Sequence, residues 1–186
     1  MRIGVISDTH GDVQAWRRAT ERFDGSDLIL HAGDVLYHPP RIPPGTGYDT
    51  MGLADLINSS EIPVVIARGN VDPEVCEEIL RIPAMSPYAF VEFGGLRIVV
   101  THGHTLTADS LGALAERYCA DVLVTGHTHI PVVERIGRAI HVNPGSPAHP
   151  KFEHGGKATA SVGLISDGAV RVVELESGEE IASLRL

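Results

Sequence analysis

Histidine, aspartate and asparagine residues stand directly behind apolar segments at five places in this chain of 186 residues. These places are SDTHGD at 7–12, AGDV at 32–35, RGNVD at 68–72, THGH at 101–104 and VTGHTH at 124–129. Together they offer carboxylate, amide and imidazole groups, and no thiolate. Imidazole suits Zn, Fe, Ni and Mn, and oxygen ligands suit Mg and Mn. The residue types therefore predict a metal site.

The apolar segments before the five motifs predict buried strands at 2–6, 27–31, 63–67, 96–101 and 121–125. In open α/β sheets, ligands bind beyond the carboxyl ends of the strands. We therefore expect the five loops to meet in one crevice. The donor groups exceed what one ion needs and fit two ions about 3.5–4 Å apart that share a bridging carboxylate. Asp34 stands alone on its loop and is the natural bridge.

The remaining pattern predicts the elements that position these loops. Helical periodicity and capping residues predict helices at 12–23, 51–58, 72–80 and 107–119, with Asp12, Asp72 and Thr107 as N-caps. Gly94 and Gly95 predict a hairpin turn. Short strands are expected at 132–136, 139–142, 161–165 and 170–175, and a loop at 37–49. This pattern predicts one α/β domain over 1–186, with two β-sheets packed face to face and helices outside.

Composition and charge limit the classes of partner. Hydrophobic residues make up 43% and charged residues 21%, which is ordinary for a soluble domain. The net charge of −9 argues against binding nucleic acid or an acidic membrane through a basic surface. The N-terminus lacks a signal-peptide core, and no apolar run approaches the ~20 residues that span a bilayer, so we expect a cytoplasmic protein. The hairpin and the late strands offer an edge for pairing in a homo-oligomer. Cys76 and Cys119 form no motif and are expected to be buried single thiols.

The five motifs, in this order, resemble those of the calcineurin-like metallophosphoesterases, whose pattern is D-x-H, G-D, G-N-x-D/E, a lone His and G-H-x-H. The stretches GDVLYHPPRIPPGTGY and HVNPGS extend the likeness to the small bacterial YfcE-type phosphodiesterase branch. The resemblance covers roughly residues 1–165. It implies an αββα sandwich and a metal-dependent phosphoesterase that acts on a small phosphate-ester substrate.

The resemblance further implies two divalent metal ions per chain, with Mn as first choice and Fe, Zn, Ni or Mg as alternatives. Seven residues would hold them: Asp8, His10 and His129 the first ion, Asn70, His102 and His127 the second, and Asp34 both. A metal-bridging hydroxide would attack phosphorus in line. We expect a phosphodiesterase. The alternatives are a phosphomonoesterase or pyrophosphatase on the same site, or a non-catalytic scaffold such as the retromer subunit of this superfamily.

The proton donor to the leaving group is open. Many relatives have histidine where this chain has Val71, and YfcE-type relatives often have cysteine there, so this branch already lacks the histidine. Valine cannot donate a proton. This departure favours diesters and good leaving groups. His104 and Asp72 are the catalytic candidates, although His104 fits a polar rim residue equally well and Asp72 fits a helix N-cap better.

Other polar residues have simpler interpretations. His31, at the end of a buried strand, is expected to be a hydrogen-bonded core histidine. The turn NPGS at 143–146 is expected to line the mouth of the site, where its N–H groups could face an anion. The rest are expected as solvated or unpartnered side chains: His38, His149 and His154 in loops, His141 in a strand, and Arg41 in the Pro-rich loop.

Overall fold

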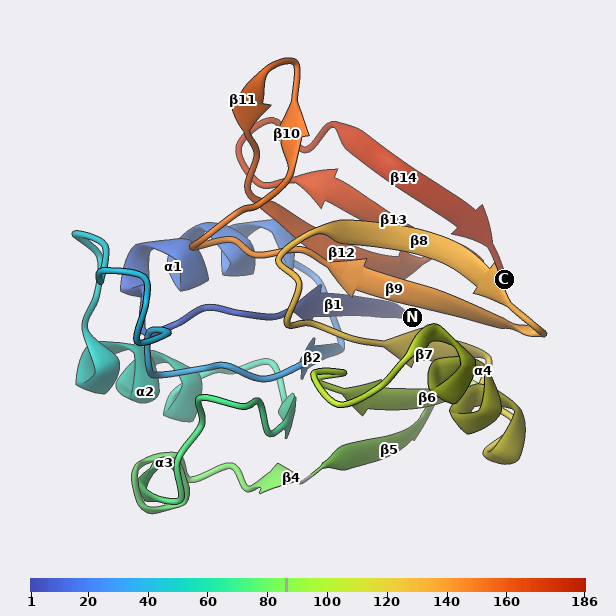
Figure 1. The fold of residues 1–186 in the computed structure, drawn as a ribbon, viewed down its shortest axis with the longest axis horizontal. Coiled ribbons are helices and arrows are strands. Elements are labelled where there is room, and N and C mark those ends of the chain that lie inside the picture. The colour runs from blue at the N-terminus through green and yellow to red at the C-terminus, as the bar shows by residue number, and fades with distance from the viewer. Residues whose placement is uncertain (86) are drawn as a thin grey trace.

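Two β-sheets form the centre of the computed structural model, which describes residues 1–85 and 87–186 (Figure 1). The seven-stranded sheet has the order β14 (Glu180–Arg185), β13 (Ala169–Glu174), β12 (Ser161–Ser166), β1 (Arg2–Ile6), β2 (Leu28–His31), β3 (Val64–Ala67) and β4 (Ala84–Met85). The five-stranded sheet has the order β5 (Tyr88–Phe93), β6 (Leu96–Thr101), β7 (Val122–Val124), β9 (Ala139–Pro144) and β8 (Pro131–Ile136). A separate ribbon pairs β10 (Glu153–His154) with β11 (Lys157–Ala158).

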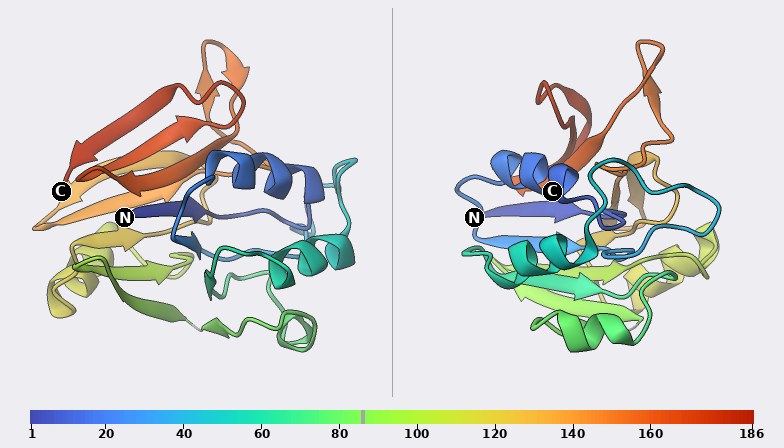
Figure 2. Two further views of the ribbon diagram at one scale, coloured as in Figure 1. Left: turned by 180° about the vertical axis from the view of Figure 1, so that it is seen from behind. Right: turned by 90° about the vertical axis from the view of Figure 1, so that its left-hand side faces the viewer.

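Helices cover the outer faces of both sheets, as the two further views show (Figure 2). The first sheet carries α1 (Val13–Arg22), α2 (Thr50–Asn58) and α3 (Val75–Ile79), and the second carries α4 (Ala108–Arg117). The buried side chains form three clusters that match these layers. One cluster lies between the sheets, around Val5, Leu30 and Val124, and the others lie beneath the helices. The predicted αββα sandwich is confirmed.

The strands that precede the five motifs are parallel within each sheet. β1 pairs with β2, and β2 with β3, in parallel register. β7 lies parallel to both β6 and β9. The carboxyl ends of β1, β2 and β3 therefore lie at one edge of the first sheet, and those of β6, β7 and β9 at one edge of the second. This arrangement brings loops together that are far apart in the sequence.

Helix caps were predicted well where a polar residue stands alone before an amphipathic run. The Asp12 carboxylate accepts from the Ala15 N–H at 2.9 Å and caps α1. The Thr107 side chain accepts from the Ser110 N–H and caps α4. The cap assigned to Asp72 is wrong, because α3 begins only at Val75 and the residue before it makes no side-chain cap. The carboxylate of Asp72 is used elsewhere, as described below.

Two further expectations need correction. Cys76 is buried as expected, but Cys119 is exposed, because α4 ends at Arg117 and the chain turns there with φ of 49° at Cys119. The strands β4, β10, β11 and β14 were not predicted. β14 closes the edge of the first sheet by antiparallel pairing with β13. No helix among the described residues is long and apolar enough to cross a membrane.

His31 is a buried core histidine, as predicted. Its ring lies 3.0 Å from the Thr9 hydroxyl and accepts the Gly33 N–H at 3.1 Å, and it stacks on Trp16. Burial lowers the pKa of His31 from its ordinary value of 6.5 to about 3. The neutral ring is therefore the form that the fold holds.

This burial predicts a pH dependence of stability. Between pH 6.5 and the folded value, the unfolded chain binds a proton at His31 that the folded chain excludes, so stability should fall as the pH drops. The slope from this one group is at most about 1.4 kcal/mol per pH unit. His31→Gln should remove this share of the slope, and the matched change His154→Gln, at an exposed position, should not. Urea unfolding of metal-free protein between about pH 7 and about pH 5 measures the slope. An unchanged slope in His31→Gln would contradict the assignment.

Candidate metal centre

The seven predicted ligands lie together where the carboxyl ends of the strands meet. Asp8 and His10 follow β1, Asp34 follows β2, and Asn70 follows β3. The second sheet supplies His102 after β6 and the pair His127 and His129 after β7. Asp8, His10, His102 and His129 are buried in full or nearly so, and Asp34 is 3% exposed. The loops after these five strands therefore meet at one place, as the sequence predicts.

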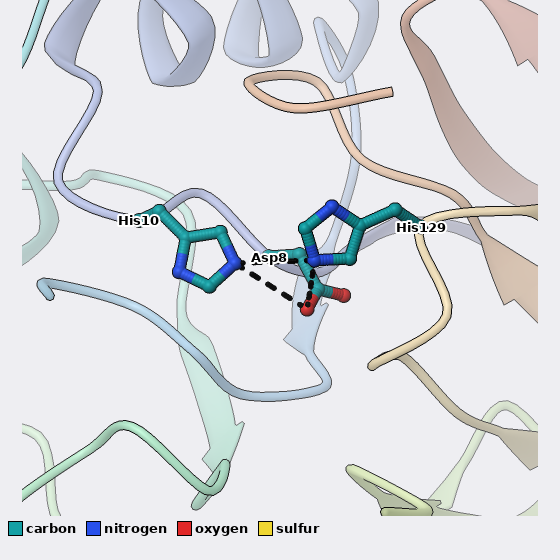
Figure 3. A group of neighbouring side chains, drawn as sticks. All are labelled: Asp8, His10 and His129. Atoms are coloured by element: carbon teal, nitrogen blue, oxygen red, sulfur yellow. Dashed lines mark hydrogen bonds and ion pairs between the residues drawn. The ribbon is translucent and has the colours of Figure 1, made fainter. Parts of the chain in front are cut away.

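The first tight group contains Asp8, His10 and His129 (Figure 3). The Nε2 atom of His129 lies 3.2 Å from Asp8 Oδ1, and that of His10 lies 3.7 Å from the same oxygen. The two Nε2 atoms are 3.2 Å apart. The three side chains therefore present one oxygen and two nitrogens to a single point.

The second tight group contains Asp8, Asp34 and His102. His102 Nε2 lies 3.2 Å from Asp34 Oδ2 and 3.0 Å from Asn70 Oδ1. Asp34 Oδ2 also approaches His10 Nε2 to 3.9 Å, so Asp34 stands between the two groups. Asp8 belongs to both groups as well. The geometry thus offers two carboxylates as bridges, whereas the sequence suggested Asp34 alone.

His127 is placed more loosely. Its ring centroid lies 5.2 Å from that of His102, on the exposed side of the second group. Its backbone N–H donates to Asp8 Oδ2 at 3.0 Å. His127 therefore lies within the same cluster, but its imidazole is outside both tight groups.

The buried imidazoles are locked in one orientation. Three rings donate Nδ1–H to a backbone carbonyl oxygen: His10 to Tyr37 at 2.8 Å, His102 to Ala32 at 2.8 Å and His129 to His149 at 2.6 Å. A carbonyl oxygen can only accept, so the proton is on Nδ1 and the lone pair of each neutral ring is on Nε2. Outer hydrogen bonds of this kind fix the tautomer of metal-binding histidines.

A cation fits the point at which these atoms converge. With both Nδ1 atoms protonated, the neutral rings of His10 and His129 direct two lone pairs at each other across 3.2 Å. Asp8 Oδ1, beside them, is buried and has no hydrogen-bond partner among the described residues. Electron pairs directed at one another are unfavourable unless a positive charge lies between them. The residues present therefore fit the divalent ions that the sequence motifs imply.

The charges of the cluster support the same conclusion. Burial favours the neutral acids, yet the imidazoles beside them hold the pKa values of Asp8 and Asp34 below their ordinary range. Burial lowers the pKa of His10. Burial also acts against the charged form of His102, but Asp34 and Asp8 raise its pKa above the ordinary value. The cluster thus holds two ionised carboxylates away from water, where they need cationic partners.

The backbone at the site is strained. Five of the predicted ligands lie in the left-handed region, with positive φ: Asp8 at 56°, His10 at 46°, Asp34 at 57°, His127 at 69° and His129 at 60°. Among the described non-glycine residues, only Cys119 and Asp167 share this conformation. Such a conformation costs of order 1–3 kcal/mol per residue and concentrates at functional sites. The strained conformation at five predicted ligands therefore indicates a functional site.

Two glycines make room for the carboxylates. A Cβ atom at position 69 would lie 2.1 Å from Asp34 Oδ1, and one at position 126 would lie 2.8 Å from Asp8 Oδ2. No side chain larger than hydrogen fits at either place unless neighbouring atoms move, and at position 126 the nearest of these is Ser7 Oγ, 1.9 Å away. The glycines of GN and GH are therefore required by close approach.

Asp72 ties the loops after β2 and β3 together. One carboxylate oxygen accepts the N–H groups of Asp34 and Gly69, and the other accepts that of Val35, each at 2.8 Å. Burial raises the pKa of Asp72 above its ordinary value, although the backbone N–H groups oppose this effect. With both oxygens occupied, Asp72 is a positioning residue here, and its proposed acid–base role gains no support from the geometry.

The NPGS segment supports the site through side-chain hydrogen bonds to the loops that carry the predicted ligands. Ser146 is fully buried, and its hydroxyl donates to the Asp8 carbonyl at 2.8 Å. Asn143 donates to the carbonyl of Gly126 at 2.7 Å and accepts the Gly145 N–H. This segment therefore holds the loops after β1 and β7 in place. Sequence reasoning did not find this role, because Ser and Asn are also common turn residues.

The other histidines differ partly from expectation. His104 is exposed at the rim, with its ring centroid 5.5 Å from that of His102, and burial lowers its pKa. His149 is half-buried and lies 5.5 Å from His10, so it is not simply solvated. His141 has partners after all, the Thr125 hydroxyl at 2.8 Å and Glu134 at 2.9 Å. Their contacts cross strands and were invisible in the sequence. His154 and Arg41 are exposed as predicted.

Comparison with known proteins gives a consistent result. Residues 1–166 match the model of the calcineurin-like phosphoesterase superfamily domain. Phosphodiesterase YfcE of Escherichia coli is 36% identical over 188 aligned positions, which cover 100% of this chain and 98% of that protein. A probable metallophosphoesterase of Methanocaldococcus jannaschii is 31% identical over 159 positions, which cover 81% of this chain and 70% of that protein.

Solved structures show the same fold. That of the E. coli phosphoesterase YfcE matches with a TM-score of 0.84 at 34% identity and covers 100% of this chain and 99% of the other. Vps29 of Chaetomium thermophilum matches with a TM-score of 0.68 at 22% identity, covering 100% and 93%. At that identity the likeness concerns the fold alone.

The role of Asp72 can be tested through metal affinity. Asp72→Asn replaces one acceptor oxygen with an amide, so at least one of the three backbone N–H groups loses its partner. Loss of an outer hydrogen bond of this kind costs roughly 10–100-fold in metal affinity. The matched change Asp109→Asn, on exposed α4, should leave affinity unchanged. Titration of metal-free protein with Mn²⁺ provides the measurement. Equal affinity in wild type and Asp72→Asn would refute the positioning role.

Proposed function

Because the chain belongs to the calcineurin-like phosphoesterase superfamily and is therefore a phosphoesterase, we propose that it hydrolyses phosphodiesters at a centre of two divalent ions. The observation that carries this proposal is the convergence of lone pairs from His10, His129 and Asp8 on one point, with Asp34 and His102 beside it. The preference for diesters is supported by the relative named phosphodiesterase, which is similar over its full length.

The chain's own residues would hold the ions and the substrate. Asp8, His10 and His129 would bind one ion, and Asn70, His102 and His127 the other, with Asp34 between them and Asp8 within reach of both. Two divalent ions at such a centre neutralise charge on the phosphate oxygens and acidify a water molecule. The nitrogen and oxygen donor set without thiolate is compatible with Mn, our first choice, and with Fe, Zn, Ni or Mg.

Proton transfer to the leaving group has few candidates. The side chain of Val71, next to the predicted ligand Asn70, carries no proton to give. His104 lies at the exposed rim near His102 and His127, and burial lowers its pKa, which favours the neutral ring. A neutral imidazole can relay a proton but is a poor acid. The chemistry therefore favours esters whose leaving groups depart without help.

The first test removes the charge of the carboxylate between the two groups. Asp34→Asn should abolish hydrolysis and leave fewer than two ions per chain, because His102 and His10 both lie beside this carboxylate. The fold should persist, since the metal centre lies outside the hydrophobic clusters. Asp24→Asn, on the surface, is the matched control. Metal analysis and hydrolysis of a nitrophenyl diester are the measurements. Near-normal activity with two bound ions would show that Asp34 does not bridge.

The second test concerns Val71. Rates for a series of diesters should depend steeply on the acidity of the leaving alcohol, because position 71 supplies no proton. Val71→His should accelerate alkyl leaving groups by up to ~10²–10⁴-fold and barely change nitrophenyl esters. Val75→His, on the exposed side of α3, controls for an added imidazole. The measurement is log rate against leaving-group pKa. A shallow slope in the wild type would mean that another group, such as His104, already donates the proton.

A further inference from the structure

An open pocket of about 360 Å³ lies between the loop after β2 and the loop after β3. Three residues of the first loop line it, Tyr37, His38 and Pro40, and so do four of the second, Asn70, Val71, Asp72 and Pro73. Its volume is near the lower end of the range of small-molecule sites, about 300–1,000 Å³. A group of the size of one ring system matches such a space.

The pocket adjoins the candidate metal centre directly, because three of its lining residues contact predicted ligands. The Tyr37 carbonyl accepts the His10 Nδ1–H at 2.8 Å. Asn70 Oδ1 lies 3.0 Å from His102 Nε2, and the Val71 N–H donates to Asp34 Oδ1 at 3.0 Å. A phosphate held at the metal centre would therefore place one of its substituents at the mouth of this pocket.

The walls suit an uncharged group. Pro40, Val71 and Pro73 offer apolar surface, and Tyr37 packs its ring against the core beneath α1 and α2. No lysine or arginine lines the pocket among the described residues. The carboxylate of Asp72, which is also a lining residue, is occupied by three backbone N–H groups. An anionic substituent would find no counter-charge here.

His38, one of the lining residues, has a ring nitrogen without a partner in the part of the chain that the structure describes. His38 Nδ1 is buried and makes no hydrogen bond among the described residues. The ring is held edge-on against Tyr48, with centroids 5.1 Å apart and an interplanar angle of 84°. Buried polar atoms are normally satisfied.

We propose that this pocket binds the organic group of the phosphate ester and that Val71 makes the enzyme selective for esters of ring-bearing alcohols or phenols. This inference rests on the proposed function, because the phosphate must bind at the metal centre. It assigns Val71 a positive role: the side chain that cannot donate a proton supplies apolar contact to the ester group.

The test uses two phosphonates that resist hydrolysis and differ only in their organic group. Phenylphosphonate and methylphosphonate are titrated calorimetrically into Mn-loaded protein, with inorganic phosphate as the reference ligand. Phenylphosphonate should bind roughly tenfold or more tightly than methylphosphonate, since even one methylene in an apolar pocket is worth about tenfold or more. Val71→Phe should fill the pocket and remove this preference without weakening methylphosphonate. The backbone N–H of residue 71, which Asp34 accepts, is unchanged by the substitution.

Val75→Phe is the matched control, because Val75 is 38% exposed on α3 and does not line the pocket. It should bind both phosphonates as the wild type does. Equal affinity of wild type for the two phosphonates, or a phenyl preference that survives Val71→Phe, would overturn the pocket assignment while leaving the proposed function standing. Failure of inorganic phosphate and both phosphonates to bind Mn-loaded protein would refute the proposed function and this inference with it.

Discussion

The approach of two imidazole nitrogens to 3.2 Å is the interaction on which this structure depends. His10 and His129 come from different sheets, and each ring is turned inward by its Nδ1–H bond to a carbonyl oxygen. Neutral rings in this arrangement repel through their lone pairs, and Asp8 Oδ1 adds a further unpaired acceptor. A divalent cation held by His10, His129 and Asp8 would offset this repulsion. The face-to-face packing of the sheets is what holds the two halves of the site at this separation.

The strained backbone of the loops costs free energy, and the packing between the two sheets offsets this cost. Five predicted ligands adopt positive φ, each at an expense of order 1–3 kcal/mol. The hydrogen bonds of Asp72 and Ser146 fix these loops from outside the cluster. The cluster between the sheets, around Val5 and Val124, is fully buried and holds the strand ends in place. Metal binding to the folded state alone would add stability by mass action. Stability and function are thus coupled at the same atoms.

The sequence predicts most of the fold and the identity of the clustered side chains, because both follow local rules. Continuous apolar runs identify β1, β2, β3, β6 and β7, and Asp12 and Thr107 mark helix starts. What fails depends on tertiary contacts. Asp72 has the local signature of a helix cap, but the N–H groups of a neighbouring loop compete for its carboxylate. The partners of His141, the burial of Ser146 and the sharing of Asp8 all involve residues from separate strands or loops, and no local pattern encodes them.

Under the proposed function, the valine at position 71 has two consequences. It removes a possible proton donor, and it gives the pocket an apolar side chain. A histidine at this point would carry a charge, or a hydrogen-bonding proton, into a space lined by Pro40 and Pro73. Valine avoids that desolvation and widens the apolar surface beside Asn70. Ring-bearing alcohols and phenols gain most from such a surface, and phenols also need the least help in leaving. Binding and leaving-group chemistry would then favour the same class of ester, so the site could dispense with a proton donor at this position.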